Sequence, residues 1–149
     1  MATDIKNTDL EQVAQEMALF AKEELHYLGA AVINLVTVLS RETGEVAGIS
    51  AEYATRLSRK PEPEKRGSSD KGTDYLAMAH GKADKRLRNE LGMDTGFPLV
   101  RRGEDEATGD SVKWLSDGLL VIAAFSGAPT PEQDQIVTDW GINRIESIK

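Results

Sequence analysis

The feature that most constrains the fold is an unbroken apolar run over residues 119–125, which stands between two turn signals. Asp117-Gly118 precedes the run, and Ser126-Gly127 follows it. An apolar run of this length is typical of a strand covered on both faces, and it is short for a helix. We therefore expect a central strand with other parts of the protein packed against both of its sides.

A helix is predicted directly after this strand. Thr130 suits the N-cap, Pro131 suits the first helical position, and Gln133 stands where a capping box places its second member. The buried stripe expected for this helix is Ile136, Val137 and Trp140. The end of the chain is thus predicted to be a strand, a tight corner and a docked helix.

The N-terminal third is predicted to form a helix and a second buried strand. Asn7 or Thr8 caps the helix, Glu11 completes a Thr-x-x-Glu box with Thr8, and the helix ends at Gly29. His26 lies off the apolar stripe and is expected on the surface. Residues 30–40 have apolar side chains for both faces of a strand. The one amide among them, Asn34, either bonds to neighbouring backbone, as most buried polar groups do, or lines a cavity.

The middle of the chain completes the predicted sheet. A turn at 42–44 and alternating apolar residues over 47–57 indicate a hairpin, and residues 60–72 are predicted to be a Pro/Gly-rich loop. The remaining predicted elements are a helix over 73–91 and strands over 97–102 and 112–115. The order α-β-β-α-β-β-β-α indicates an α+β fold, with an antiparallel sheet of about five strands and flanking helices.

Length and composition exclude several classes of protein. With 149 residues, a single domain over 1–149 is expected. The absence of cysteine excludes disulfides and thiolate metal sites, and it favours a cytoplasmic location. No secretion signal or membrane-spanning run is evident. A net charge of −7 argues against nucleic acid as a partner, so neither nucleic acid nor membrane is expected.

The charge is unevenly distributed along the chain. Residues 56–102 hold 12 Lys and Arg against 7 Asp and Glu, which makes this segment +5 within an acidic protein. One interpretation is a solvated loop and a charged helix face. The other is a local anion site for phosphate, carboxylate or propionate groups.

His80 is the main candidate for site chemistry. In the predicted helix over 73–91, one face carries Leu76, His80, Ala83, Leu87 and Leu91, so the imidazole is expected to be partly buried. It is either a packed histidine with internal hydrogen bonds or a group that faces a cavity. In the second case a neutral His80 would bind iron, while Lys82 and Arg86 would meet porphyrin carboxylates.

Three segments resemble one known family. Asp117-Gly118 with the apolar strand and Ser126-Gly127 resembles the corresponding strand of the GlcG/HbpS-like proteins, often called the haem-degrading domain family. Pro-Glu-Gln-Asp at 131–134 is similar to the start of that family's last helix, and Ala-His-Gly-Lys-Ala at 79–83 is similar to its A-x-x-KA-x-x-A helix. The resemblance spans most of the chain, and its most specific residues lie in the last third.

The resemblance implies a profilin- or PAS-like sheet, a homo-oligomer, and association with haem or another small molecule. The function expected from it is a soluble haem- or small-cofactor-binding protein, with haem degradation as an implied activity. His80 would be the metal ligand, and Lys82, Arg86 and Trp114 would contact the cofactor. The alternative is a non-enzymatic oligomeric scaffold or small-molecule sensor. Self-association is expected through the sheet or the terminal helix, with Trp114 and Trp140 as candidate contacts.

Overall fold

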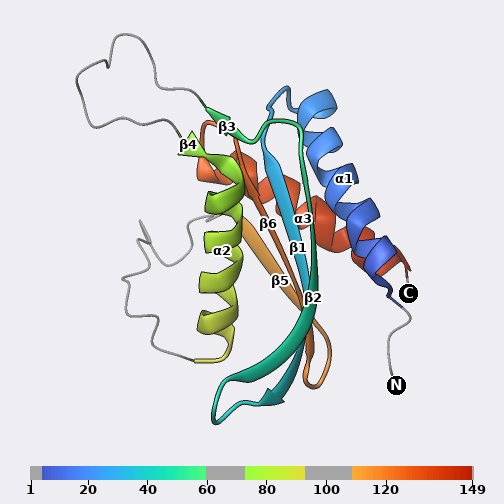
Figure 1. Ribbon diagram of the computed structural model, residues 1–149. Coiled ribbons are helices and arrows are strands. Elements are labelled where there is room, and N and C mark those ends of the chain that lie inside the picture. The colour runs from blue at the N-terminus through green and yellow to red at the C-terminus, as the bar shows by residue number, and fades with distance from the viewer. Residues whose placement is uncertain (1–4, 60–72, 93–108, 149) are drawn as a thin grey trace, which may run out of the picture.

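An open antiparallel sheet forms the middle layer of the molecule (Figure 1). The computed structural model describes residues 5–59, 73–92 and 109–148. In these residues the four strands of the sheet run in the order β2-β1-β6-β5, and a separate two-stranded ribbon pairs β3 with β4. The elements are α1 (Asn7–Glu24), β1 (Ala30–Ser40), β2 (Glu45–Ala54), β3 (Ser58–Arg59), β4 (Thr73–Asp74), α2 (Tyr75–Glu90), β5 (Asp110–Ser116), β6 (Leu119–Ser126) and α3 (Pro131–Ile148).

Helices cover both faces of this sheet. Figure 1 shows α1 and α3 on one side and α2 on the other. Alternate residues of β6 enter the two resulting cores: Val121, Ala123 and Phe125 face α1 and α3, whereas Leu120, Ile122 and Ala124 face α2. Every one of these six side chains is fully buried. The strand covered on both faces, expected from the apolar run, is confirmed.

The predicted fold class is confirmed at the level of an α+β protein with an antiparallel sheet. β1 has the predicted bounds, and β2 follows it through the predicted hairpin. The strand predicted at 97–102 and the loop predicted at 60–72 lie outside the described residues. No helix in the described parts of the chain has the length and apolar character to cross a membrane.

The ends of α1 differ from the prediction. At its start, the backbone N–H of Lys6 donates to the Asp9 carboxylate (2.7 Å), and the predicted Thr-x-x-Glu box is not used. At its end, Leu25 caps the helix and the exposed His26 adopts a left-handed conformation (φ 64°). Gly29 does not end the helix. It lies just before β1, where a Cβ would stand 2.1 Å from a β6 carbonyl oxygen, so the close approach of two chain segments explains the glycine.

The stripe by which α3 docks also differs from the prediction. Thr130 caps the helix as expected, because its hydroxyl accepts a hydrogen bond from the backbone N–H of Gln133 (3.3 Å). Ile136 is 48% exposed, so its assignment to the buried stripe was wrong. The buried residues of α3 are Asp134, Val137, Thr138, Gly141, Ile142 and Ile145. Met17 of α1 packs against Gly141, where a Cβ would lie 2.5 Å from its sulfur, and this close contact fixes the face that α3 buries.

Trp140 belongs to the contact between α1 and α3. Its ring stacks on that of Phe20 with 4.8 Å between centroids, and both pack against the core. The two helices on this face and α2 on the other account for the burial of β1 and β6. The apolar character of these strands therefore does not require a second copy, and self-association remains a prediction.

Candidate functional site

The ionisable side chains of α2 lie on two opposite sides of the helix. Ala79 and Ala83 contact the sheet and are 0% and 1% exposed. Because two residues turn a helix by about 200°, His80 and Lys82 point to opposite sides of this contact line. His80 faces β2 and is 46% exposed, so the expectation that it lies on the buried face was wrong. The helix packs Ala79 and Ala83, with Leu76 and Leu87, against the sheet, and the imidazole stays at the rim.

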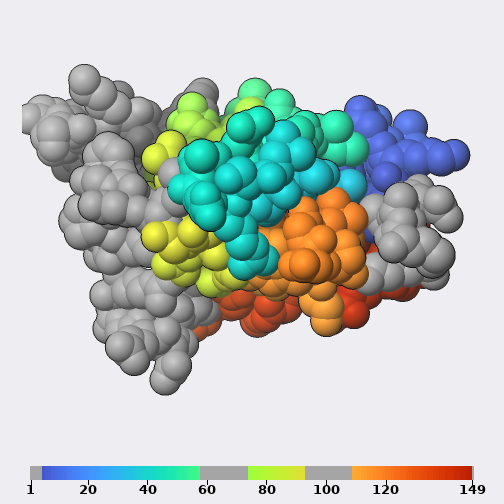
Figure 2. All heavy atoms as spheres, turned by 90° about the horizontal axis from the view of Figure 1, so that it is seen from below, coloured from blue at the N-terminus to red at the C-terminus, as the bar shows by residue number. Residues whose placement is uncertain are grey.

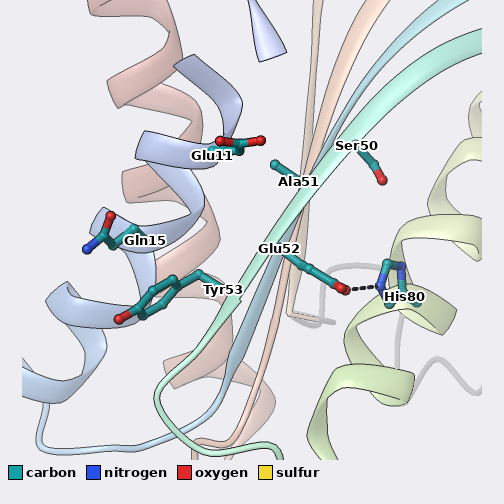
Figure 3. A pocket seen from close by; sticks show the side chains of 7 residues that line it. All are labelled: Glu11, Gln15, Ser50, Ala51, Glu52, Tyr53 and His80. Carbon is teal, nitrogen blue, oxygen red and sulfur yellow. Dashed lines mark hydrogen bonds and ion pairs between the residues drawn. The ribbon is translucent and has the colours of Figure 1, made fainter. Parts of the chain in front are cut away.

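A groove follows the outer edge of β2 (Figure 3). Its volume is about 520 Å³. It is lined by Glu11 and Gln15 of α1, by Ser50, Ala51, Glu52 and Tyr53 of β2, and by His80 of α2. β2 is the last strand of the described sheet on this side, so the groove crosses a sheet edge from α1 to α2. Three elements thus contribute polar side chains to one accessible surface.

Glu52 and His80 form the contact across this groove. Glu52 Oε2 lies 2.6 Å from His80 Nε2, and the two side chains are 50% and 46% exposed. Among the described residues no other hydrogen bond reaches the imidazole of His80, and its Nδ1 atom has no partner there. When Nε2 holds the proton that bonds to Glu52, Nδ1 keeps a lone pair. A histidine oriented by a carboxylate in this way has the arrangement usual for metal ligands.

Ser50 lies beside this pair but is not joined to it. Ser50 and Glu52 are two residues apart on β2 and therefore lie on the same face of the strand. No hydrogen bond connects the Ser50 hydroxyl to His80. A serine nucleophile needs a base within hydrogen-bonding reach. The groove therefore holds an oriented imidazole without an activated hydroxyl.

The other side of α2 is closed by a buried ion pair. Lys82 Nζ donates to the Phe125 carbonyl oxygen (2.8 Å) and to Asp134 Oδ2 (3.0 Å). The other carboxylate oxygen of Asp134 accepts the backbone N–H of Ala128 (3.0 Å). The side chains of Lys82 and Asp134 are only 19% and 7% exposed. This pair fastens α2 to the corner between β6 and α3.

Burial controls the protonation of Asp134. Desolvation raises the pKa of its carboxyl above the ordinary value of 3.8. The positive charge of Lys82 and the hydrogen bonds from Lys82 and Ala128 lower the pKa, but they do not cancel the effect of burial. The ionised form of Asp134 is therefore disfavoured by its surroundings, even with a lysine beside it.

Arg86 is held one turn further along the same side of α2. Its Nε atom lies 2.5 Å from Asp110 Oδ1, and its terminal nitrogen donates to the Asp110 carbonyl oxygen (3.3 Å). Gln135 Nε2 donates to the same carbonyl (2.7 Å) and to the Ser111 hydroxyl (2.7 Å). Thr138 Oγ1 lies 2.8 Å from that hydroxyl. A polar network thus connects α2, β5 and α3.

Trp114 occupies a third place, near the hairpin end of the sheet. Figure 2 views this end, with the β1–β2 hairpin in cyan beside the β5–β6 hairpin in orange and the end of α2 in yellow. The guanidinium of Arg41 lies over the Trp114 ring, 4.6 Å from its centroid. Trp114 Nε1 donates to Glu90 Oε2 (3.2 Å). The indole is partly buried against the core under α2.

The four residues predicted for a cofactor site do not converge in this structure. His80 lies at the β2 edge, Lys82 reaches Asp134 of α3, Arg86 reaches Asp110 of β5, and Trp114 lies near the hairpins. Lys82 and Arg86 have acidic partners, so in this structure they do not form the free anion site that the basic segment suggested. The other cations of that segment at residues 60–71 and 101–102 lie outside the described residues.

Several residues of these clusters were not found from the sequence. Asp134 and Thr138 share the i, i+3, i+4 and i+7 spacing of Val137 and Gly141, which was a sufficient signal that they are buried. Glu52 gave no signal, because its partner on α2 is 28 residues away. Of the two alternatives for Asn34, backbone bonding does not hold for its Oδ1 atom, which is buried and has no hydrogen-bond partner among the described residues. Its neighbour across the sheet is Ser50, which lines the groove.

Two further findings bear on the site. Among the described residues, no group of three or more His, Cys, Asp or Glu side chains is placed to hold a metal ion. Comparisons with protein-family models, with curated proteins and with solved structures find no match to this chain. The case for a function therefore depends on the geometry of the groove and of the two sides of α2.

Proposed function

We propose that this protein is a non-enzymatic binding module, a scaffold or sensor, whose ligand surface is the groove at the outer edge of β2. The observation that carries the proposal is an accessible groove of about 520 Å³ alongside a strand that pairs on one side only among the described residues. Ligand sites in proteins typically have volumes of about 300–1,000 Å³. The groove is within this range and lies where backbone groups of a sheet edge are available to a partner.

The pairing of the ionisable groups supports a non-enzymatic role. Lys82 and Arg86, the cations nearest to the buried core, are compensated by Asp134 and Asp110. In the groove, His80 is oriented by Glu52 but has no hydroxyl hydrogen-bonded to it. An acyl-transfer mechanism needs such a nucleophile–base contact. The accessible groups of the groove are therefore better suited to recognition than to this chemistry.

Fragment screening by amide NMR tests the binding surface. With a library of small polar and aromatic fragments, we expect the largest shift changes at Ser50, Glu52, Tyr53 and His80. Glu52→Ala should weaken these fragments at least about threefold, which corresponds to the loss of one exposed charged contact. Glu23→Ala is the matched control, since Glu23 is an exposed carboxylate of α1 outside the groove. Fragments that cluster on another surface, or that bind Glu52→Ala unchanged, would contradict the proposal.

Haem or small-cofactor binding is the second candidate, and the free Nδ1 of His80 favours it. A carboxylate at Nε2 leaves Nδ1 as the atom that would bind iron. Lys82 and Arg86 would contact propionate groups only after leaving Asp134 and Asp110. Trp114 would join the site only if the cofactor extended toward the hairpins. Haem degradation would require this binding first, so it is tested by the same experiment.

A haemin titration separates the two candidates. If His80 binds iron, the Soret band of haemin should shift on addition of the protein, and the shift should be lost in His80→Ala. His26→Asn is the control for the only other histidine, and asparagine tolerates the left-handed backbone at that position. A shift that survives His80→Ala would remove His80 as the ligand. The absence of any shift would reject the haem candidate.

Three proposals follow from the family resemblance or the composition. A profilin- or PAS-like classification is proposed for the four-stranded sheet with its three helices. Self-association is proposed through the sheet or through the terminal helix, α3. A cytoplasmic location is proposed because the chain contains no cysteine. Each is supported by the sequence and awaits a direct test.

A further inference from the structure

We infer that the β2 edge receives an extended, basic segment of a partner protein, which adds to the sheet as one more strand. This inference deepens the proposed binding function and rests on it. It follows from three properties of the edge: its lack of protection against pairing, its exposed apolar side chains, and its negative charge. Each property belongs to residues of β2 or of the helices beside it.

The first property is that no strand in the described part of the chain pairs with the outer edge of β2. Natural edge strands are usually protected by proline, by lysine, by a bulge or by being very short. β2 has ten residues and contains neither proline nor lysine. The one irregularity in its pairing with β1 lies at the hairpin end, between Val38 and Ser40, so residues 46–54 follow a regular register. This length of regular, unprotected strand offers a continuous template for backbone hydrogen bonds.

The second property is an apolar row on the α1 face of the strand. Ile49 and Tyr53 are 41% and 38% exposed, although both are large apolar or aromatic residues. Ala51 lies between them on the same face and is 6% exposed. Side chains on the same face of neighbouring strands pack against one another. Ile49 and Tyr53 would therefore be covered by apolar residues of an added strand.

The third property is the charge of the groove. Glu11 lies on its α1 side and Glu52 on its α2 side, and none of the described residues that line it is Lys or Arg. Glu45 adds a further exposed carboxylate at the start of β2. A second copy of this acidic chain would bring the same carboxylates together, which is unfavourable for like charges. A partner with basic side chains would instead be attracted, so charge complementarity favours it.

These properties define the sequence that would fit. In strand addition, main-chain hydrogen bonds supply much of the affinity and alternate side chains supply the specificity. Apolar residues of the partner would face Ile49 and Tyr53, and Lys or Arg at the intervening positions would face Glu52. The partner segment is thus expected to alternate between apolar and basic residues with a period of two.

The test is a selection from a phage-displayed library of random twelve-residue peptides against the full chain. We expect enriched peptides with net positive charge and the alternating pattern. Their affinity should fall about tenfold in Glu52→Lys, because the attraction becomes repulsion. Their affinity should also fall in Glu11→Lys, for the same reason. Glu23→Lys reverses an exposed charge outside the groove and should bind as the wild type does. Circular dichroism confirms that each variant is folded.

Amide hydrogen exchange then distinguishes the ways in which the inference would fail. Strand addition should slow exchange at every second residue of β2, since alternate N–H groups of an edge strand point outward. Neutral or acidic peptides, or no enrichment at all, would overturn the inference. Peptides that shift the amide NMR signals of groove residues without slowing amide exchange in β2 would overturn strand addition and leave the binding function intact. Peptides bound at another surface would contradict both.

A further possible outcome is that a second copy of this chain occupies the β2 edge. Sedimentation of the peptide-free protein would then show a concentration-dependent dimer, and the outward amides of β2 would be protected without any peptide. That pair of results would overturn the inference of a basic partner segment. A monomer with rapidly exchanging outward amides would support it.

Discussion

The two sides of α2 carry similar charged pairs in very different surroundings. On the side of β2, His80 and Glu52 are about half exposed and close to each other at the rim of a groove. On the side of α3, Lys82 and Asp134 are nearly buried and also bond to backbone groups. Water can replace a lost partner on the first side but not on the second. The buried pair is therefore a structural junction, and the exposed pair is available for recognition.

The largest expected effect on stability comes from removing one partner of the buried Lys82–Asp134 pair. Asp134→Ala leaves Lys82 without its carboxylate and Ala128 N–H without its acceptor. Removing one partner of a buried ion pair typically costs about 3–5 kcal/mol, and the partial exposure of Lys82 favours the lower end. We expect a loss of about 3 kcal/mol in the free energy of unfolding, measured by urea denaturation. A loss below about 1 kcal/mol, the range of exposed pairs, would show that water compensates this junction.

The second expected effect, smaller than the first, is the pH dependence of stability that Asp134 causes. It tests the buried side of α2 more closely. Burial raises the pKa of this carboxyl in the folded protein, so its contribution to stability is fully present below its ordinary pKa of 3.8. That contribution is lost as the pH rises through the folded-state pKa. Asp134→Asn stays neutral at every pH and serves as the reference. We therefore expect the stability of the wild type relative to Asp134→Asn to fall as the pH rises above 3.8.

Urea denaturation of both proteins at several pH values measures this difference, and effects of the other carboxyl groups largely cancel. A relative stability that rises with pH would mean that the attraction of Lys82 exceeds the cost of burial. Asp134 would then behave as an ordinary ion-paired aspartate. The junction would still be structural, but its physical origin would differ from the one argued above.

The smallest effect on stability is expected on the open side. Glu52→Ala and His80→Ala each remove one member of an exposed pair, and such pairs contribute about 0.2–1 kcal/mol. We expect changes within about 0.5 kcal/mol in the same urea experiment. A loss as large as that of Asp134→Ala would make this pair a structural junction too, and the contrast between the two sides of α2 would disappear.

The sheet and helices were largely predictable because their signals are local. The apolar run of β6 and the apolar residues of β1 each specify a strand covered on both faces, and Gly118 (φ 86°) marks the turn before β6. The polar clusters were harder to predict, since Lys82 and Asp134 are 52 residues apart and their spacing holds no trace of the contact. Only the tertiary arrangement of α2 and α3 brings them together.

The error over His80 has a specific physical cause. The predicted face of α2 contained His80 beside Leu76, Ala83 and Leu87, whereas the face that packs against the sheet contains Ala79 beside the same three residues. Both stripes obey helical spacing. Burying alanine lets the helix approach the sheet closely and keeps the imidazole near water. Sequence periodicity alone does not choose between Ala79 and His80 as a member of this stripe, because both positions obey helical spacing.

The most direct test of the open edge of β2 needs no ligand. Amide hydrogen exchange of the free protein should show protection throughout β1 and β6, because both strands pair on both sides. In β2 we expect alternation, with slow exchange at amides bonded to β1 and rapid exchange at those that face the groove. Uniform protection along β2 would mean that its outer edge is already covered, and it would contradict the account of this edge as a binding surface.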